Sequence, residues 1–152
     1  MRRAYHVFAY IIAAEVVIQA MMIATAVAGL DHWIEDDHAT VTKKVIDSHP
    51  SFTGSFGFPV HAINGEMLIP LFALILLVIS FFAGVVGGTR WALYILGLIV
   101  IQAVLGISSG KVPLLALLHG LNAFAIFTIA VLTARRAKAQ TADATTATAA
   151  AV

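Results

Sequence analysis

Four long apolar stretches dominate this chain of 152 residues. They cover roughly residues 5–30, 59–86, 91–109 and 113–134, and each is close to the roughly 20 residues that a helix needs to cross a bilayer. Charged residues make up only 11% of the sequence, whereas soluble domains carry about 25%. The sequence therefore predicts an all-α integral membrane protein, with a four-helix transmembrane bundle over residues 1–136.

Basic residues are unequally distributed between the two sides of the predicted bundle. One side carries Arg2, Arg3, Arg90, Arg135, Arg136 and Lys138, and the other carries Lys43, Lys44 and Lys111. Segments rich in lysine and arginine stay in the cytoplasm, so we expect both termini to be cytoplasmic and the long loop 31–58 to lie outside. The chain is predicted to be a multi-pass protein of a bacterial cell membrane.

The composition excludes several classes of function. The chain has no cysteine, so it forms no disulfide, iron–sulfur cluster or thiolate metal site. Its formal net charge of +1 gives no reason to expect nucleic acid as a partner. The partner that its hydropathy predicts is the lipid bilayer. The alanine- and threonine-rich segment 137–152 has nothing to bury, so we expect a disordered tail there.

Two short motifs occur twice, in the same order. The sequence VVIQA at 16–20 returns as IVIQA at 99–103, and His-x-x-Asn at 61–64 returns at 119–122. The bundle is thus predicted to consist of two tandem helical hairpins, in which the second and fourth spans are parallel. Such repeats are related by an axis along the membrane normal, which places the two histidines across the bundle from each other.

These two histidines have two interpretations. A lone intramembrane histidine usually hydrogen-bonds to a neighbouring helix, because polar groups in lipid need a partner. A symmetric pair on diagonal helices instead favours axial ligation of one heme iron, with His61 and His119 on opposite faces of the macrocycle. Two axial histidines leave no open iron position, which favours electron transfer over oxygen activation. We therefore predict a bis-histidine heme site.

Small and polar residues lie close to both histidines and in the third span. A small side chain one turn from an iron ligand lets the edge of the macrocycle approach the backbone. The residues predicted to contact the heme, besides the two histidines, are Asn64, Gly65, Gly106, Asn122 and Ala123. The alternative is ordinary packing between membrane helices, which also uses small residues.

The depth of the two histidines differs if each helix begins at its proline. His61 lies two residues after Pro59, whereas His119 lies six residues after Pro113. At about 1.5 Å per residue this difference corresponds to an offset of about 6 Å along the bundle. The two imidazoles then share one heme only if the second helix starts earlier or is tilted.

Two acidic residues lie inside predicted spans. Glu15 is near the middle of the first, with Gln19 one turn further on the same face. It is a weak catalytic candidate, through contact with a proton or a quinone headgroup, and the alternative is an interhelical hydrogen bond from a protonated acid. Glu66 follows His61 by five residues, about 140° round an α-helix, so we expect it to face away from the ligand.

The outer loop is acidic near its start and aromatic near its end. Its last segment, SFTGSFGF at 51–58, is predicted to fold over the heme edge, with Lys43, Lys44 or Lys111 meeting the propionates. The residues near its start that could gather a divalent cation are His32, Glu35, Asp36 and His38. Exposed acidic loops are usually only solvated, so we predict no metal site there.

Two longer stretches resemble one four-helix half of the heme A synthase family. They are VHAINGEMLIPLFALILLVISF at 60–81 and GLIVIQAVLGISSGKVPLLALLHGLNAFAIF at 97–127. In that family, paired histidines of the second and fourth helices bind heme. The resemblance therefore implies that His61 and His119 hold a heme b near the outer membrane face.

The chain also departs from that family. The family enzyme has eight helices in two such halves, and its catalytic half has an acidic residue shortly before the first histidine. Here the segment GFPV at 57–60 precedes His61, and the outer-loop cysteine pair of many members is absent. We therefore expect the heme-holding half of the family's architecture without its oxidising chemistry.

Three functions follow from these observations. The preferred one is a small membrane cytochrome b that transfers electrons near the outer face, with a quinol or another redox partner. The second is a heme-modifying or oxidase-assembly protein, related to heme A synthase and working as a homodimer that restores eight helices. The third is a heme-free accessory subunit of a larger membrane complex. Whether the protein is an enzyme stays open among them.

Overall fold

The computed structural model describes the backbone of residues 1–36 and 40–150 and the side chains of residues 1–36 and 40–140. Its elements are α1 (Arg2–Asp36), α2 (Lys43–Asp47), α3 (Gly57–Ile63), the π-helix η1 (Asn64–Leu68), α4 (Ile69–Ser80), α5 (Gly88–Ser109) and α6 (Leu115–Ala150). No strand occurs in this described part of the chain. The predicted all-helical class is therefore confirmed.

Four helical segments are long and apolar enough to cross a membrane. They are Arg2–Asp36, Gly57–Ser80, Gly88–Ser109 and Leu115–Gln140. The second of these consists of α3, η1 and α4 in direct succession. The prediction of a multi-pass membrane protein with four spans agrees with these lengths and hydropathies.

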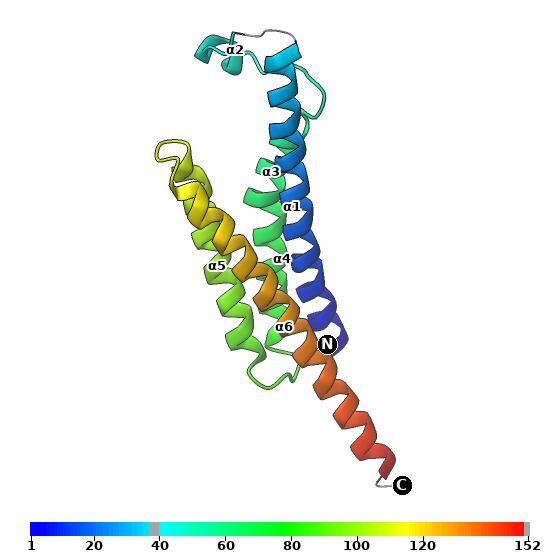
Figure 1. Ribbon diagram of the computed structural model, residues 1–152. Coiled ribbons are helices and arrows are strands. Elements are labelled where there is room, and N and C mark those ends of the chain that lie inside the picture. Colours follow the sequence, from blue (N-terminus) through cyan, green and yellow to red (C-terminus); the bar gives the residue numbers. More distant parts are fainter. Residues whose placement is uncertain (37–39, 151–152) are drawn as a thin grey trace.

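The spans follow one another around the bundle. α1 packs against α6 and against α3 and α4, and α5 packs against α4 and α6. The second and fourth spans are therefore diagonal, as the sequence predicted (Figure 1). The N-terminus and the α4–α5 connection lie at one end of the bundle, where Arg2 donates a hydrogen bond to the carbonyl of Gly84 at 3.0 Å.

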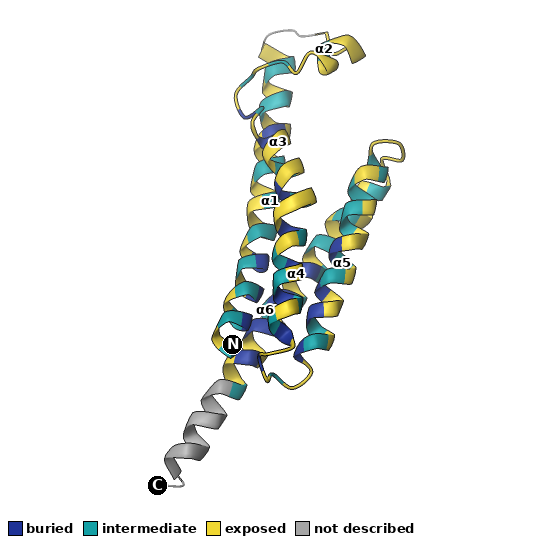
Figure 2. Ribbon diagram, turned by 180° about the vertical axis from the view of Figure 1, so that it is seen from behind, coloured by how far each residue is buried: buried dark blue, intermediate teal, exposed yellow. Residues whose placement is uncertain are grey.

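The bundle is tightly packed only in the half next to that end. Ala9 and Ala13 of α1 belong to the same buried cluster as Ala130 and Ala134 of α6, and such small side chains let membrane helices approach closely. In the other half, the α5–α6 pair diverges from α1 and α3, and fewer residues are buried (Figure 2). The divergence leaves room for a cavity between the spans.

A π-helical turn interrupts the second span just ahead of Pro70. The turn covers Asn64–Leu68, and Pro70 is the second residue of α4. Proline has no N–H to bond the carbonyl of Glu66 four residues earlier, and its ring crowds that carbonyl. The i→i+5 bonds of a π-turn accommodate this loss. Pro70 thus changes the helical phase of the residues ahead of it.

Several boundaries differ from the expected ones. α4 ends at Ser80, and the α4–α5 connection turns through Gly84 and Gly87, whose φ angles are +60° and +72°. α6 continues as helix to Ala150, where the sequence predicted a disordered tail. Alanine is the strongest helix former, and extending an existing helix avoids the unfavourable nucleation step.

The segment that precedes α3 lies closely along α1. A β-carbon at Gly29 would come within 1.8 Å of the carbonyl oxygen of Thr53, and one at Gly57 within 2.3 Å of that of Met22. Trp33 stacks on Phe52, with ring centroids 5.5 Å apart. Glycine and aromatic contacts therefore hold the outer loop against the extended end of α1.

Candidate functional site

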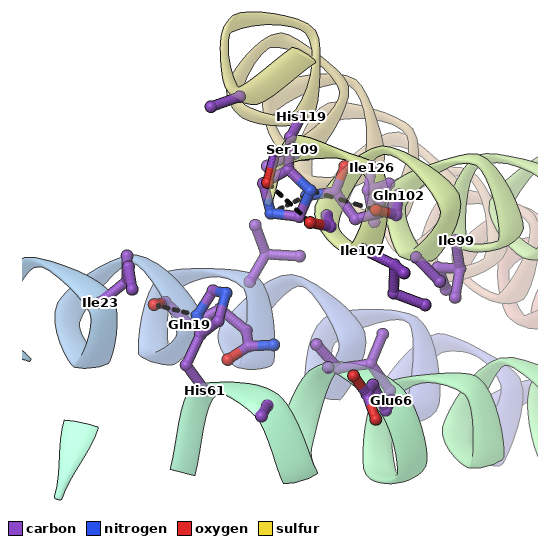
Figure 3. A pocket seen from close by; sticks show the side chains of 18 residues that line it. Gln19, Ile23, His61, Glu66, Ile99, Gln102, Ile107, Ser109, His119 and Ile126 are labelled. Carbon is purple, nitrogen blue, oxygen red and sulfur yellow. Dashed lines mark hydrogen bonds between the residues drawn. The ribbon is translucent and has the colours of Figure 1, made fainter. Parts of the chain in front are cut away.

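A cavity of about 430 Å³ opens where the spans diverge. Residues of α1, α3, η1, α4, α5 and α6 line it, and most of these residues are aliphatic or small. The polar lining residues are Gln19, His61, Glu66, Gln102, Ser109 and His119. Figure 3 shows the two histidines on opposite walls of this cavity.

The structure brings the two imidazoles together. The ring centroids of His61 and His119 are 6.2 Å apart, and the ring planes are inclined by 56°. The offset suggested by the prolines does not arise, because α3 begins at Gly57 and α6 begins at Leu115. Each histidine is therefore the fifth residue of its helix, so the two rings lie at a similar depth.

A backbone carbonyl orients each imidazole in the same way. His61 Nδ1 lies 3.1 Å from the carbonyl oxygen of Gln19, and His119 Nδ1 lies 3.1 Å from that of Gln102. A carbonyl oxygen only accepts hydrogen bonds, so both Nδ1 atoms carry the hydrogen. Both Nε2 atoms then keep a lone pair that can bind a metal.

The two Nε2 atoms differ in their surroundings. The side-chain amide of Gln102 donates to His119 Nε2 at 3.1 Å, and its Oε1 accepts a hydrogen bond from Asn122 at 2.7 Å. His61 Nε2 has no hydrogen-bond partner among the described residues. Gln102 must therefore turn away before His119 can bind iron through Nε2, whereas His61 is free to do so.

Neither asparagine of the repeated motif lines the cavity, although the sequence predicted both as heme contacts. Asn64 donates to Glu15 Oε2 at 2.8 Å, and Asn122 donates to the carbonyl oxygen of Leu98 at 2.8 Å. Both side chains thus join their helix to a neighbouring one, as is usual for polar groups in membrane bundles. Glu15 likewise lies outside the cavity lining.

The predicted small residues Gly65, Ala123 and Gly106 all line the cavity. Two of them also make room for protein side chains. A β-carbon at Gly106 would come within 3.0 Å of His119 Cε1, and one at Gly65 within 2.5 Å of Gln19 Nε2. Gly106 therefore leaves room for the imidazole of His119, and Gly65 leaves room for the side-chain amide of Gln19.

Glu66 lies in the cavity lining with His61, contrary to the expectation that it faces away. The expectation assumed α-helical phase, in which five residues leave the two side chains about 140° apart. The π-turn at Asn64–Leu68 adds a residue to the turn, so residues five apart come onto the same face. The expected orientation of Glu66 was wrong because the turn between His61 and Glu66 is not α-helical.

The outer loop does not close the cavity. None of its described residues lines the cavity, and Phe52 and Phe58 pack against each other, with ring centroids 6.5 Å apart, and not over the histidines. Lys43 pairs with Asp47 at 2.6 Å. The predicted lid is therefore wrong for this arrangement, because the loop packs along α1.

The acidic residues near the start of this loop do not gather around a common point. His32 pairs with Asp36 at 3.1 Å on the exposed end of α1. Among the described residues, no group of three or more histidine or acidic side chains is placed to hold a metal ion. His38 lies outside the described residues.

The two imidazoles are close enough to bind one metal ion together once Gln102 turns away from His119 Nε2. An imidazole nitrogen binds a metal at about 2.0–2.1 Å, which puts the ring centroid about 3 Å from the metal. Two rings on opposite sides of one ion are therefore roughly 6 Å apart, and the observed centroid distance is 6.2 Å. The two imidazoles are the residues of this apolar cavity that could hold a metal-bearing ligand.

The sequence signals for this site were incomplete. The repeated IQA motif marked Gln19 and Gln102, but their carbonyl contacts with the histidines depend on how the helices pack. No protein-family model, curated protein or solved structure matches this chain.

Proposed function

We propose that this protein is a small membrane cytochrome b that holds one heme b between His61 and His119. The observation that carries the proposal is the pair of facing imidazoles, whose ring centroids are 6.2 Å apart and whose Nδ1 atoms both meet a backbone carbonyl. The resemblance of roughly residues 60–134 to one half of heme A synthase supports the same ligand pair.

The protein's own residues would prepare and enclose this site. The carbonyls of Gln19 and Gln102 fix the protonated nitrogen of each imidazole, and thus keep the opposite nitrogen available for iron. Ile99 and Ile126 contribute to an apolar wall that limits the access of water. When bound, heme iron with two imidazole ligands exchanges single electrons.

We also propose how the bundle is oriented in the membrane and that its two helical hairpins are structural repeats. The bundle end that carries Arg2, Arg90 and Arg135 would face the cytoplasm, according to the distribution of basic residues. The histidines, near the opposite ends of their spans, would then lie near the outer face of a bacterial cell membrane. Two tandem hairpins related by an axis along the membrane normal would account for the matching contacts of Gln19 and Gln102.

Six-coordinate heme suits electron transfer, with a quinol as the donor and a redox protein at the outer face as the acceptor.

The test is an absorption spectrum of the purified protein, oxidised and reduced, for the wild type and for His61→Ala and His119→Ala. We expect a low-spin spectrum in the wild type and a high-spin or heme-free protein in each variant. His6→Ala, at the other end of the bundle, is the matched control and keeps the low-spin spectrum. Low-spin heme in both single variants would contradict the ligand assignment.

One observation favours the heme-free accessory subunit as a second candidate. The amide of Gln102 already satisfies His119 Nε2 and the side chain of Asn122, so this half of the site is a complete hydrogen-bond network without any ligand. A colourless protein that remains colourless with added hemin would favour this candidate. Modified heme in the purified protein would instead favour the assembly protein, which would act as a homodimer.

A further inference from the structure

A carboxyl group and an amide meet in the middle of the bundle. Asn64 Nδ2 donates to Glu15 Oε2 at 2.8 Å, and Asn64 is only 4% exposed. Asn64 Oδ1 is buried and has no hydrogen-bond partner among the described residues. A buried carbonyl oxygen without a donor is unfavourable, so the pair lacks a hydrogen-bond donor for Asn64 Oδ1.

The other half of the bundle shows that packing does not require an acid at this position. Asn122 holds the place of Asn64 in the repeated motif and donates to the carbonyl of Leu98 and to Gln102 Oε1. Leu98 precedes Gln102 by four residues, as Glu15 precedes Gln19. The asparagine is therefore held without a carboxyl group in one half, and Glu15 is an addition in the other.

Among the residues with described side chains, no arginine or lysine pairs with Glu15. The elements packed on α1 carry His61 on α3, Glu66 on η1 and His119 on α6, whereas α4 carries no ionisable residue. The arginines and lysines of α1 and α6 all lie near the bundle end that carries the N-terminus: Arg2 and Arg3 of α1, and Arg135, Arg136 and Lys138 of α6. An ionised carboxylate here would keep its charge in lipid with a single hydrogen bond, which is unfavourable.

A proton on Glu15 supplies the missing donor. A protonated carboxyl has one O–H that can donate to Asn64 Oδ1, while its other oxygen accepts from Asn64 Nδ2. If the amide of Asn64 were turned round, the 2.8 Å contact would join two oxygens, and that contact also needs a proton between them. Both orientations of the amide thus lead to the same protonation state.

We propose that Glu15 and Asn64 form a proton-binding site within the membrane, in which a protonated carboxyl and an amide are joined by two hydrogen bonds. The site lies beside the cavity, since Asn64 follows His61 by three residues and Val16, next to Glu15, lines the cavity. It goes beyond the proposed electron transfer, and its existence does not depend on heme.

The test is the infrared carbonyl band of a protonated carboxylic acid, recorded at neutral pH on the full chain in detergent, with and without added hemin. We expect a band that is lost in Glu15→Gln and kept in the control Glu35→Gln, whose side chain is exposed at the outer end of α1. Glu15→Gln should still fold, because its amide can make both hydrogen bonds to Asn64 without a proton. Identical spectra of wild type and Glu15→Gln in this region would overturn the proposal.

A second pair of variants tests the partner. Asn64→Leu should shift the carboxylic acid band, because the carboxyl loses its hydrogen-bonded amide, whereas Asn122→Leu should leave it unchanged. Asn64→Ser takes the place of Asn64→Leu if the latter does not fold. A band that does not move in the Asn64 variant would overturn the assignment of the pair. Failure of the heme proposal would appear separately, as a colourless protein whose carboxylic acid band is intact.

Discussion

Gly106 on α5 lies so close to His119 on α6 that a β-carbon at this glycine would come within 3.0 Å of the imidazole Cε1. The position of one proposed iron ligand thus depends on the absence of a side chain on the neighbouring helix. The same contact explains why a glycine in the third span belongs to the site. A larger side chain at this position should therefore disturb the ligand.

Gly106→Val should displace the imidazole of His119 and convert low-spin heme to a high-spin form. The physical reason is that its branched side chain would occupy the place of the ring. Gly97→Val on the same helix is the matched control, because nothing lies within 4 Å of a β-carbon there. The heme spectrum of each variant, normalised to protein, checks the expectation. A low-spin Gly106→Val protein would show that the ring has room to move.

Gln102→Ala should accelerate the binding of hemin, because the amide that occupies His119 Nε2 is removed. A hydrogen bond is worth about 1 kcal/mol net, so the rate should rise several-fold, up to about tenfold. The backbone carbonyl that holds His119 Nδ1 remains in this variant. Gln19→Ala is the control, since Gln19 Oε1 has no partner among the described residues. Stopped-flow absorbance measures both rates, and equal rates would rule out this role of Gln102.

Glu15→Leu should destabilise the folded protein, whereas Glu15→Gln should not. Leucine leaves the buried amide of Asn64 without any partner, and an unsatisfied buried group costs about 1–3 kcal/mol. Thermal unfolding in detergent compares the two variants with the wild type. If the leucine variant is as stable as the glutamine variant, the side chain of Asn64 has found another partner.

Gly29→Ala should release the outer loop from α1 without altering the heme spectrum. The new methyl group would collide with the carbonyl of Thr53, which lies within 1.8 Å of its position. The described part of the loop does not line the cavity, so the iron ligands should be unaffected. Limited proteolysis between residues 31 and 58 measures the release. A changed spectrum in this variant would mean that the loop contributes to the heme pocket after all.

Composition and pattern alone determined the four spans and the diagonal position of the two histidine segments. The apolar stretches are local properties of the chain, and the thickness of a bilayer converts their length into helices. An up-and-down connectivity then makes successive spans neighbours, so the order of the repeated motifs is enough to place His61 and His119 on diagonal helices. These features depend little on how individual side chains pack.

The tertiary structure decided the helical phase and the partners of the site residues. α3 begins at Gly57 and α6 at Leu115, which puts both histidines at a similar depth despite their different distances from proline. The π-turn ahead of Pro70 brings Glu66 into the cavity wall. Such shifts of phase and the choice of carbonyl or carboxylate partners arise from contacts between helices, and the sequence of one helix does not contain them.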